Sequence, residues 1–256
     1  MPEMDVMILD VTRMKEDRIC IAGLYYDEEK KYRNIRPVPP YGNICSEFLT
    51  SKCDREIEPF SVVRFNFSRS VENPPHVEDM VFEDRKAGAI SYVKKVAPEK
   101  RKRILDSISC GSLPEIFGEN LVDNKFLYEG EKGASLGCLA AHRVSGPTVK
   151  IKSYEDEQRK LEIRLGISTG VKKAYYSVVE RRLYKFVLDE IAKGKTVAVI
   201  ESELKKKLFN VSPVYVRVGL TRPWRKQSDE DKDPRKKCWV QVLGIHTFPD
   251  YLTKEI

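Results

Sequence analysis

Short stretches in which apolar and polar residues alternate recur along almost the whole chain, and no other feature limits its possible folds as strongly. Between residues 61 and 68, Val63, Phe65 and Phe67 lie on one side of an extended chain and Arg64 and Asn66 on the other. Comparable runs with turn residues between them predict further strands at 4–11, 19–26, 32–38, 76–82, 136–144, 149–152, 161–165, 196–200, 214–220 and 238–245.

Only a few segments have helical periodicity. Residues 98–109 begin with Pro98, which favours the first turn of a helix, and carry a basic run at 100–103. Residues 178–193 place apolar side chains at helical spacing and end before Gly194, and a shorter basic helix is expected around 203–209. Many short strands with two or three helices favour two small β-barrels with helical inserts over a doubly wound α/β fold.

The boundary between the two halves is expected in the irregular segment 110–134. We therefore predict a first domain at 1–134, with a helical insert and this connection, and a second, basic domain with the long helix at 135–256. Because the connection lacks the composition of a flexible spacer, its apolar side chains are expected to wedge between the barrels in a shared interface. These apolar side chains are Leu113, Ile116, Phe117, Leu121, Val122, Phe126 and Leu127.

The end of the chain, 248–252, is expected to pack back against the protein as a clasp in which Asp250 caps a turn.

Positive charge is concentrated in the second half. Residues 1–145 carry 22 basic and 24 acidic side chains, a net charge of −2, whereas residues 146–256 carry 24 basic and 15 acidic side chains, a net charge of +9. Clustered cations favour a polyanionic partner, because neutralising phosphates releases their counterions. The alternative is a solvated surface rich in both signs of charge.

Other features narrow the cellular setting. The six cysteines include no C-x-x-C pair, which argues against a zinc ribbon or a dense disulfide framework and favours a reducing, cytoplasmic location. No apolar run approaches the roughly 20 residues that span a bilayer, and the first residues lack the pattern of a signal peptide. We expect no membrane partner.

The strands at 214–220 and 238–245 suggest a binding surface. Alternation places the valines of both strands on one face and leaves Tyr215, Arg217, Trp239 and Gln241 on the other. If the strands pair, two aromatic rings, a guanidinium and an amide form a platform on which bases stack. The alternative is that Tyr215 and Trp239 cover a second apolar core.

The loop between these strands extends the predicted surface. It contains Trp224 together with Arg222, Arg225 and Lys226, although its acidic residues also allow a self-neutralising loop. Arg222 precedes a proline, as Arg36 does, so each guanidinium is expected at an extended strand end, where it is available to phosphate or to a base edge. The alternative is that each arginine pairs with a local carboxylate and fixes a loop.

Catalytic motifs are weak. The three histidines are far apart in sequence, no glycine-rich phosphate loop follows a strand, and no serine or cysteine lies in a nucleophile elbow. A metal-dependent nuclease built on Asp189, Glu203 and Lys205 is the least favoured alternative. We expect no enzymatic activity, no cofactor and no metal.

Four segments carry a family resemblance: Arg18-Ile-Cys-Ile-Ala-Gly23, Asn34-Ile-Arg-Pro-Val38, the run 216–224 (VRVGLTRPW) and the run 238–252 (CWVQVLGIHTFPDYL). They resemble the dual OB-containing domain family, although residues 13–17 (RMKED) depart from its pattern. The resemblance implies a mainly β (α+β) protein of two small OB-like β-barrels with helical inserts, and a predicted nucleic-acid-binding role.

Together these observations predict a non-enzymatic protein that binds nucleic acid, single-stranded DNA or RNA in preference to duplex. The predicted contact residues are Arg36, Tyr215, Arg217, Arg222, Trp224, Arg225, Lys226, Trp239 and Gln241. The alternative function is a protein-interaction subunit whose barrels position a partner enzyme or effector.

Overall fold

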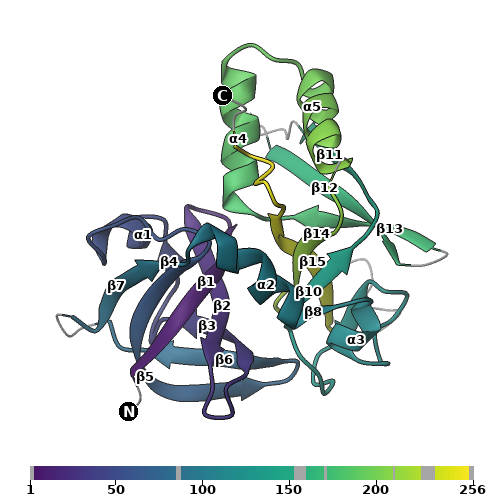
Figure 1. Cartoon of the computed structure of the whole chain (residues 1–256). Helices are drawn as coiled ribbons and strands as arrows, with labels where there is room; N and C mark the ends of the chain where they lie inside the picture. The colour runs from purple at the N-terminus through teal and green to yellow at the C-terminus, as the bar shows by residue number, and fades with distance from the viewer. Residues whose placement is uncertain are drawn as a thin grey trace.

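The first half of the chain folds into a closed five-stranded barrel (Figure 1). The computed structural model describes residues 3–84, 88–152, 160–169, 172–209, 211–225 and 234–253. The barrel strands follow the order β1-β2-β3-β6-β5, β1 also pairs with β5, and β3 and β6 are parallel. Their bounds are β1 Glu3–Arg13, β2 Arg18–Tyr26, β3 Tyr32–Val38, β5 Ser61–Asn73 and β6 His76–Phe82; the short β4 (Ile44–Cys45) pairs with β2, β7 (Ile90–Lys95) pairs with β5, and helix α1 is Phe48–Ser51.

A bend in β1 closes this barrel. Residues 3–7 pair with β5, residues 7–13 pair with β2, and the register shifts between Ile8 and Asp10. The alternation predicted for residues 61–68 is confirmed, because Val63, Phe65 and Phe67 are buried in the barrel core. The strand therefore has one face in the core and one face toward solvent, as its sequence indicates.

The second half repeats this strand order. Its sheet runs β11-β12-β13-β15-β14-β10, with β13 and β15 parallel. The consecutive strands β10 and β11, separated by His142 and Arg143, lie at opposite ends of this path, so together they correspond to the bent β1. The bounds are β10 Leu136–Ala141, β11 Val144–Lys152, β12 Lys160–Thr169, β13 Lys172–Val178, β14 Val214–Leu220 and β15 Lys237–His246. The predicted fold class, mainly β with two OB-like units, is confirmed.

Helices occupy equivalent places in both halves. Helix α1 lies in the chain between β3 and β5, and α4 (Arg181–Ala192) and α5 (Val197–Phe209) lie between β13 and β14. Helix α2 (Pro98–Ile108) lies at the junction of the two barrels (Figure 1). The strand expected at 196–200 is wrong, because these residues open α5, where Ile200 is buried with Leu204 and Leu208 at helical spacing. None of the described helices is both long and apolar enough to cross a bilayer.

The connection between the halves is part of the second barrel. Strand β8 (Ser109–Cys110) pairs with β10, helix α3 spans Leu113–Phe117, and β9 (Phe126–Tyr128) pairs with β15. The expectation that this segment wedges between the barrels is wrong for its main apolar side chains, since Leu113, Phe117, Leu121 and Leu127 are buried in the second core. The predicted domain boundary after residue 134 assigns this segment to the first domain. Its strands β8 and β9 instead pair with strands of the second sheet.

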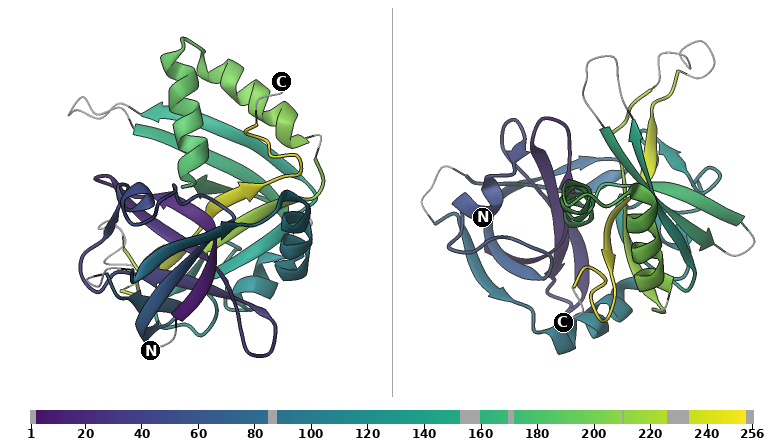
Figure 2. Two further views of the ribbon diagram at one scale, coloured as in Figure 1. Left: turned by 60° about the vertical axis from the view of Figure 1, so that its left-hand side comes forward. Right: turned by 90° about the horizontal axis from the view of Figure 1, so that it is seen from above.

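The two halves share an extended interface, as expected, in which the outer face of β1–β3 lies against the outer face of β10, β14 and β15 (Figure 2). Apolar side chains meet there, among them Met7, Leu9, Leu24 and Tyr215. The C-terminal clasp is also confirmed: the Phe248 ring contacts the Tyr215 ring, and Asp250 Oδ1 accepts a hydrogen bond from the Leu252 amide.

A fully buried ion pair crosses this interface. Arg217 on β14 and Asp10 on β1 are both 0% exposed, and the guanidinium donates to both carboxylate oxygens from Nε (3.2 and 3.1 Å) and from Nη2 (2.9 Å). Arg217 Nη1 also donates to Asn34 Oδ1 at 3.1 Å. Asn34 in turn donates to the Leu136 carbonyl at 3.2 Å, which ties β3 to β10. Each side chain neutralises the other, and neither barrel on its own would bury such a charge unpaired.

Removing one partner of this pair is therefore expected to destabilise the protein strongly. Arg217→Met leaves Asp10 buried without its counter-ion and should lower the free energy of unfolding by about 3–5 kcal/mol. The double variant Asp10→Leu/Arg217→Met should recover most of that loss. The matched control is Arg64→Met, which breaks an exposed pair with Asp5 and should lower stability far less. Chemical denaturation measures all three, and equal losses in Arg217→Met and Arg64→Met would contradict the prediction.

Candidate nucleic-acid interface

The predicted binding platform lies on one sheet face, as the alternation indicates. In the β14–β15 pair, Gly219 is opposite Gln241, and after a register shift Arg217 and Tyr215 are opposite Gly244 and His246. The other face enters the second core through the valines of both strands. Tyr215, Arg217, Trp239 and Gln241 therefore point away from that core together.

Half of this face is covered by the first barrel. Tyr215 and Arg217 are buried, and the Tyr215 hydroxyl donates a hydrogen bond to Asp106 of α2. The expectation that these two residues form an exposed platform is wrong. Alternation identifies which side chains of a strand point away from the core of their own barrel. In this chain, Tyr215 and Arg217 on that side contact the other barrel instead of water.

The two Arg-Pro motifs converge on one carboxylate. Arg36 Nη1 lies 2.8 Å from Asp79 Oδ1, and Arg222 Nη2 lies 2.6 Å from Asp79 Oδ2. Arg36 is buried and also donates to Ser135 Oγ at 3.1 Å, so the expectation that it projects from a barrel rim is wrong, and the pairing alternative describes it. The side chain of Arg222 stays 50% exposed, so its guanidinium is still accessible to a ligand.

His76 joins the same cluster and bridges the barrels. Its Nδ1 lies 3.5 Å from Arg36 Nη1, and its Nε2 lies 3.1 Å from the carbonyl oxygen of Thr221. Because arginine only donates and a carbonyl only accepts, the ring is neutral with its proton on Nε2. Burial, reinforced by the positive charges of Arg36 and Arg222, lowers the pKa of His76 to about 4.

The other half of the predicted platform forms a ladder of rings and cations at the β9–β15 pair. The Trp239 ring contacts the Phe126 ring at 4.9 Å between centroids, and Phe126 contacts Tyr128 at 5.4 Å. The Lys237 ammonium lies 5.1 Å from the Phe126 centroid and the Arg235 guanidinium 3.6 Å from the Tyr128 centroid. We call these five residues the aromatic ladder.

Trp224 and its neighbours lie at the edge of the ladder. Trp224 is 43% exposed and exchanges backbone hydrogen bonds with Lys237. Arg225 Nη1 donates to the carbonyl oxygen of Pro234 at 2.9 Å. Lys226, also predicted as a contact residue, lies outside the described residues. Gln241 is partly buried at the other end of the same strand face.

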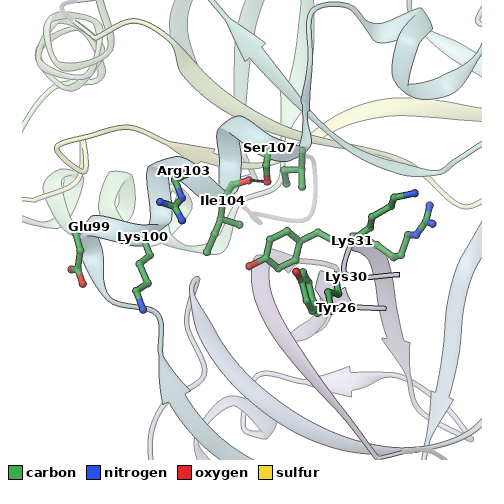
Figure 3. A pocket seen from close by; sticks show the side chains of 11 residues that line it. Tyr26, Lys30, Lys31, Glu99, Lys100, Arg103, Ile104 and Ser107 are labelled. Atoms are coloured by element: carbon green, nitrogen blue, oxygen red, sulfur yellow. Dashed lines mark hydrogen bonds between the residues drawn. The ribbon is translucent and has the colours of Figure 1, made fainter. Parts of the chain in front are cut away.

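A groove that the sequence analysis did not identify lies between α2 and the β2–β3 hairpin. It has a volume of about 970 Å³. Figure 3 shows Lys100, Arg103 and Ile104 on the helix, with Tyr26 and Lys30 across from them on the hairpin. We call it the α2 groove; it is lined by Tyr26, Lys30, Lys31, Tyr32, Arg33, Glu99, Lys100, Arg103, Ile104, Ser107 and Ile108.

Only part of the positive charge in the α2 groove is neutralised. Arg33 and Lys31 form ion pairs with Asp27 and Glu29 of the hairpin turn. By contrast, Lys30, Lys100 and Arg103 take part in none of the ion pairs found within the described ranges. The Tyr26 ring is 58% exposed and contacts the Tyr32 ring at 5.1 Å and 60°. The basic run at 100–103 was a visible signal, but nothing local in the sequence pairs it with residues 26–33.

The residues of the nuclease alternative are engaged elsewhere. Glu203 pairs with Lys195 at 2.8 Å, and Lys205 pairs with Glu201 at 3.4 Å. Asp189 is exposed on α4, and no described contact joins it to either residue. Within the described residues, His, Cys, Asp and Glu side chains form no cluster of three or more that is arranged to hold a metal ion.

The neutral His76 predicts that acid weakens the protein. Its pKa is lower in the folded state, about 4, than the ordinary value of 6.5, so the unfolded chain binds more protons and stability is lost as the pH falls below 6.5. At pH 5 the loss from this residue is about 2 kcal/mol. His76→Gln should reduce the difference in unfolding free energy between pH 7 and pH 5 by that amount. Urea titrations at both pH values provide the test, and an unaltered pH dependence in His76→Gln would refute it.

Comparisons with known proteins define the family. No curated protein matches the sequence. Solved structures with a similar course of the chain include a murine DNA-binding protein bound to double-stranded DNA (8% identity, 94% of this chain and 90% of that chain covered, TM-score 0.32) and the p204 HINb domain (14%, 93% and 95%, 0.31). Another is the Ifi202 HINa domain in complex with 20-base-pair double-stranded DNA (9%, 89% and 88%, 0.32). Similarities this weak say nothing about what this chain binds. The model of the dual OB-containing domain matches residues 4–245, almost the whole chain. The resemblance carried by the four sequence segments is thereby confirmed, and the chain belongs to the dual OB-containing domain family.

Proposed function

We propose that this protein binds single-stranded nucleic acid, DNA or RNA, and catalyses no reaction on it. The observation that carries the proposal is the α2 groove, where an exposed tyrosine ring lies beside cations that the described ion pairs leave unneutralised. Proteins that bind single strands combine these two elements, because the cations follow the phosphates while the rings stack on bases.

The exposed ring favours an unpaired strand. In a duplex the faces of the bases are stacked on one another, so a protein ring reaches them only where the strand is open. Tyr26 presents its ring from the hairpin, and Tyr32 supports it from the neighbouring strand through their edge contact. A base stacked on Tyr26 would lie opposite the α2 helix.

The cations of the groove supply affinity without sequence preference. Lys100 and Arg103 are three residues apart on α2, so they share one side of the helix. Each phosphate that they neutralise releases condensed counterions from the strand. Binding at the α2 groove is therefore sensitive to salt.

The aromatic ladder, together with Trp224 and its neighbours at the edge, is a second contact surface in this proposal. Half-exposed Trp224 is available for stacking, and Arg222 and Arg225 flank it on the chain, followed by Lys226. Trp239 and Gln241 lie on the strand behind it. Of the residues predicted from the sequence, these six are the ones that we retain as contact candidates.

A protein-interaction role is the second candidate, favoured by one observation. Helices α4 and α5 expose the apolar side chains Leu188, Val199 and Phe209, and the Phe209 side chain is 82% exposed. Exposed apolar side chains contribute to docking surfaces for other proteins.

The α2 groove yields a direct binding prediction. Tyr26→Ala should weaken binding of a labelled single-stranded oligonucleotide by about 1–3 kcal/mol, because a base loses its stacking partner, whereas Tyr26→Phe should retain most of the affinity. Lys100→Ala/Arg103→Ala should weaken binding and reduce the salt dependence by about 0.7 in slope for each phosphate that is no longer neutralised. The matched controls, Tyr41→Ala and Lys52→Ala/Lys185→Ala, change exposed residues outside the groove and should leave affinity unchanged.

Fluorescence anisotropy with single-stranded DNA, single-stranded RNA and duplex, each in rising salt, measures these effects. Tighter binding to duplex than to either single strand would contradict the preference stated here. If none of the three binds at low salt, the nucleic-acid proposal fails and the protein-interaction role replaces it.

The aromatic ladder and Trp224 at its edge are tested separately. Trp224→Ala should weaken oligonucleotide binding by roughly 1–3 kcal/mol without lowering the thermal midpoint, since the ring is half exposed. Trp239→Ala removes a ring packed on Phe126 and is expected to lower both affinity and stability. Unchanged affinity in both variants, measured per folded molecule, would remove the ladder from the binding surface.

A further inference from the structure

A separate pocket opens between the two barrels. It has a volume of about 360 Å³ and shares no lining residue with the α2 groove. Its walls come from β1–β3 and the segment after β3 on one side and from β14 and β15 on the other. This volume lies within the range of roughly 300–1,000 Å³ found for small-molecule sites. We call it the inter-barrel pocket.

The charges around the inter-barrel pocket favour an anionic group. Three guanidinium side chains line it, those of Arg13, Arg36 and Arg222, against the single carboxylate of Asp10. Asp10 is already bound by Arg217, and both oxygens of Asp79 are occupied by Arg36 and Arg222. A guanidinium has five donors, so half-exposed Arg222 keeps donors for a further acceptor. A phosphate is an anion that such a planar fork binds through two parallel hydrogen bonds.

The rest of the lining suits a heterocyclic base. Gln241 is partly buried, and its side-chain amide takes part in none of the hydrogen bonds found in the described part of the chain. An amide offers a donor and an acceptor side by side, which matches the edge of a base. The apolar walls offer surface for the face of a ring; they are Met14, Ile19, Ala22, Ile44, Val179, Leu220 and Leu243.

From these features we infer that the inter-barrel pocket binds one nucleoside monophosphate unit, with the phosphate on Arg222 and an edge of the base on Gln241. The unit is either a free mononucleotide or one nucleotide of a strand, since both present the same chemistry. The site is distinct from the α2 groove and does not depend on binding there, but it shares Arg222 and Gln241 with the second contact surface of the proposed function.

Isothermal titration of the full chain with AMP, GMP, CMP and UMP tests this inference. At least one mononucleotide should bind more tightly than both its nucleoside, which lacks the phosphate, and ribose 5-phosphate, which lacks the base. Arg222→Gln should weaken mononucleotide binding by about 10-fold or more, because it removes a charge-assisted contact. Gln241→Leu should reduce the preference among the four bases while leaving ribose 5-phosphate binding unchanged.

Arg64→Gln is the matched control. Arg64 is similarly exposed and also pairs with one carboxylate, Asp5, but lies outside the pocket, so its variant should bind mononucleotides normally. Because Arg222 also contacts Asp79, thermal unfolding identifies any fraction of Arg222→Gln that fails to fold. Gln241→Leu keeps the inference testable in that case, since it removes no described side-chain hydrogen bond.

Three results would overturn the inference: no mononucleotide binds, ribose 5-phosphate binds as tightly as the mononucleotides, or both pocket variants bind like the unaltered protein. Competition then distinguishes the sources, because displacement of the mononucleotide by an oligonucleotide assigns the pocket to a nucleotide within a strand. The two proposals can fail independently. Loss of oligonucleotide binding in the α2-groove variants, with normal mononucleotide binding, supports both sites. Mononucleotide binding without any oligonucleotide binding supports the pocket alone.

Discussion

The buried guanidinium of Arg217 determines how the two barrels are arranged. A charge with no access to water persists only if an opposite charge lies beside it, and the carboxylate that satisfies Arg217 comes from the other half of the chain. The buried carboxylate of Asp10 likewise requires the positive charge of Arg217 beside it. The outer faces of β1 and β14 must therefore meet, and the surrounding apolar and polar contacts between the halves follow from that meeting. A ligand reaches only what this contact leaves uncovered, which is the ladder, the groove beside α2 and the pocket at the edge of the interface.

Alternation in the sequence predicted most strands and their core faces, but not what covers the opposite faces. The pattern of β14 correctly separates its valines from Tyr215 and Arg217, yet the same pattern is produced whether the second face meets water or another barrel. A further signal was present in the sequence: Asp10 interrupts the apolar run of β1, and Arg217 interrupts the valines of β14. Opposite charges inside two otherwise apolar strands are a reason to expect that the strands face each other.

Other differences have local causes. Residues 196–200 are mostly β-branched, which favours a strand in a short window, but Ile200 lies with Leu204 and Leu208 on one buried stripe of a helix. The groove escaped sequence analysis because its two walls, 26–33 and 99–108, are separated by the rest of the first barrel. Of the predicted contact residues, Arg222 and Trp224, which follow β14, are exposed as expected.

The segments that carry the family resemblance have a common location in the structure. They include β2, β3, β14 and β15, the strands at or beside the contact between the barrels. Within that contact, one carboxylate, Asp79, pairs with two guanidiniums whose positions in the chain are 186 residues apart. The three side chains depend on one another, because loss of Asp79 would remove the counter-ion of both arginines at once. The segments that carry the resemblance, at both ends of the chain, thus supply the strands through which the two barrels dock.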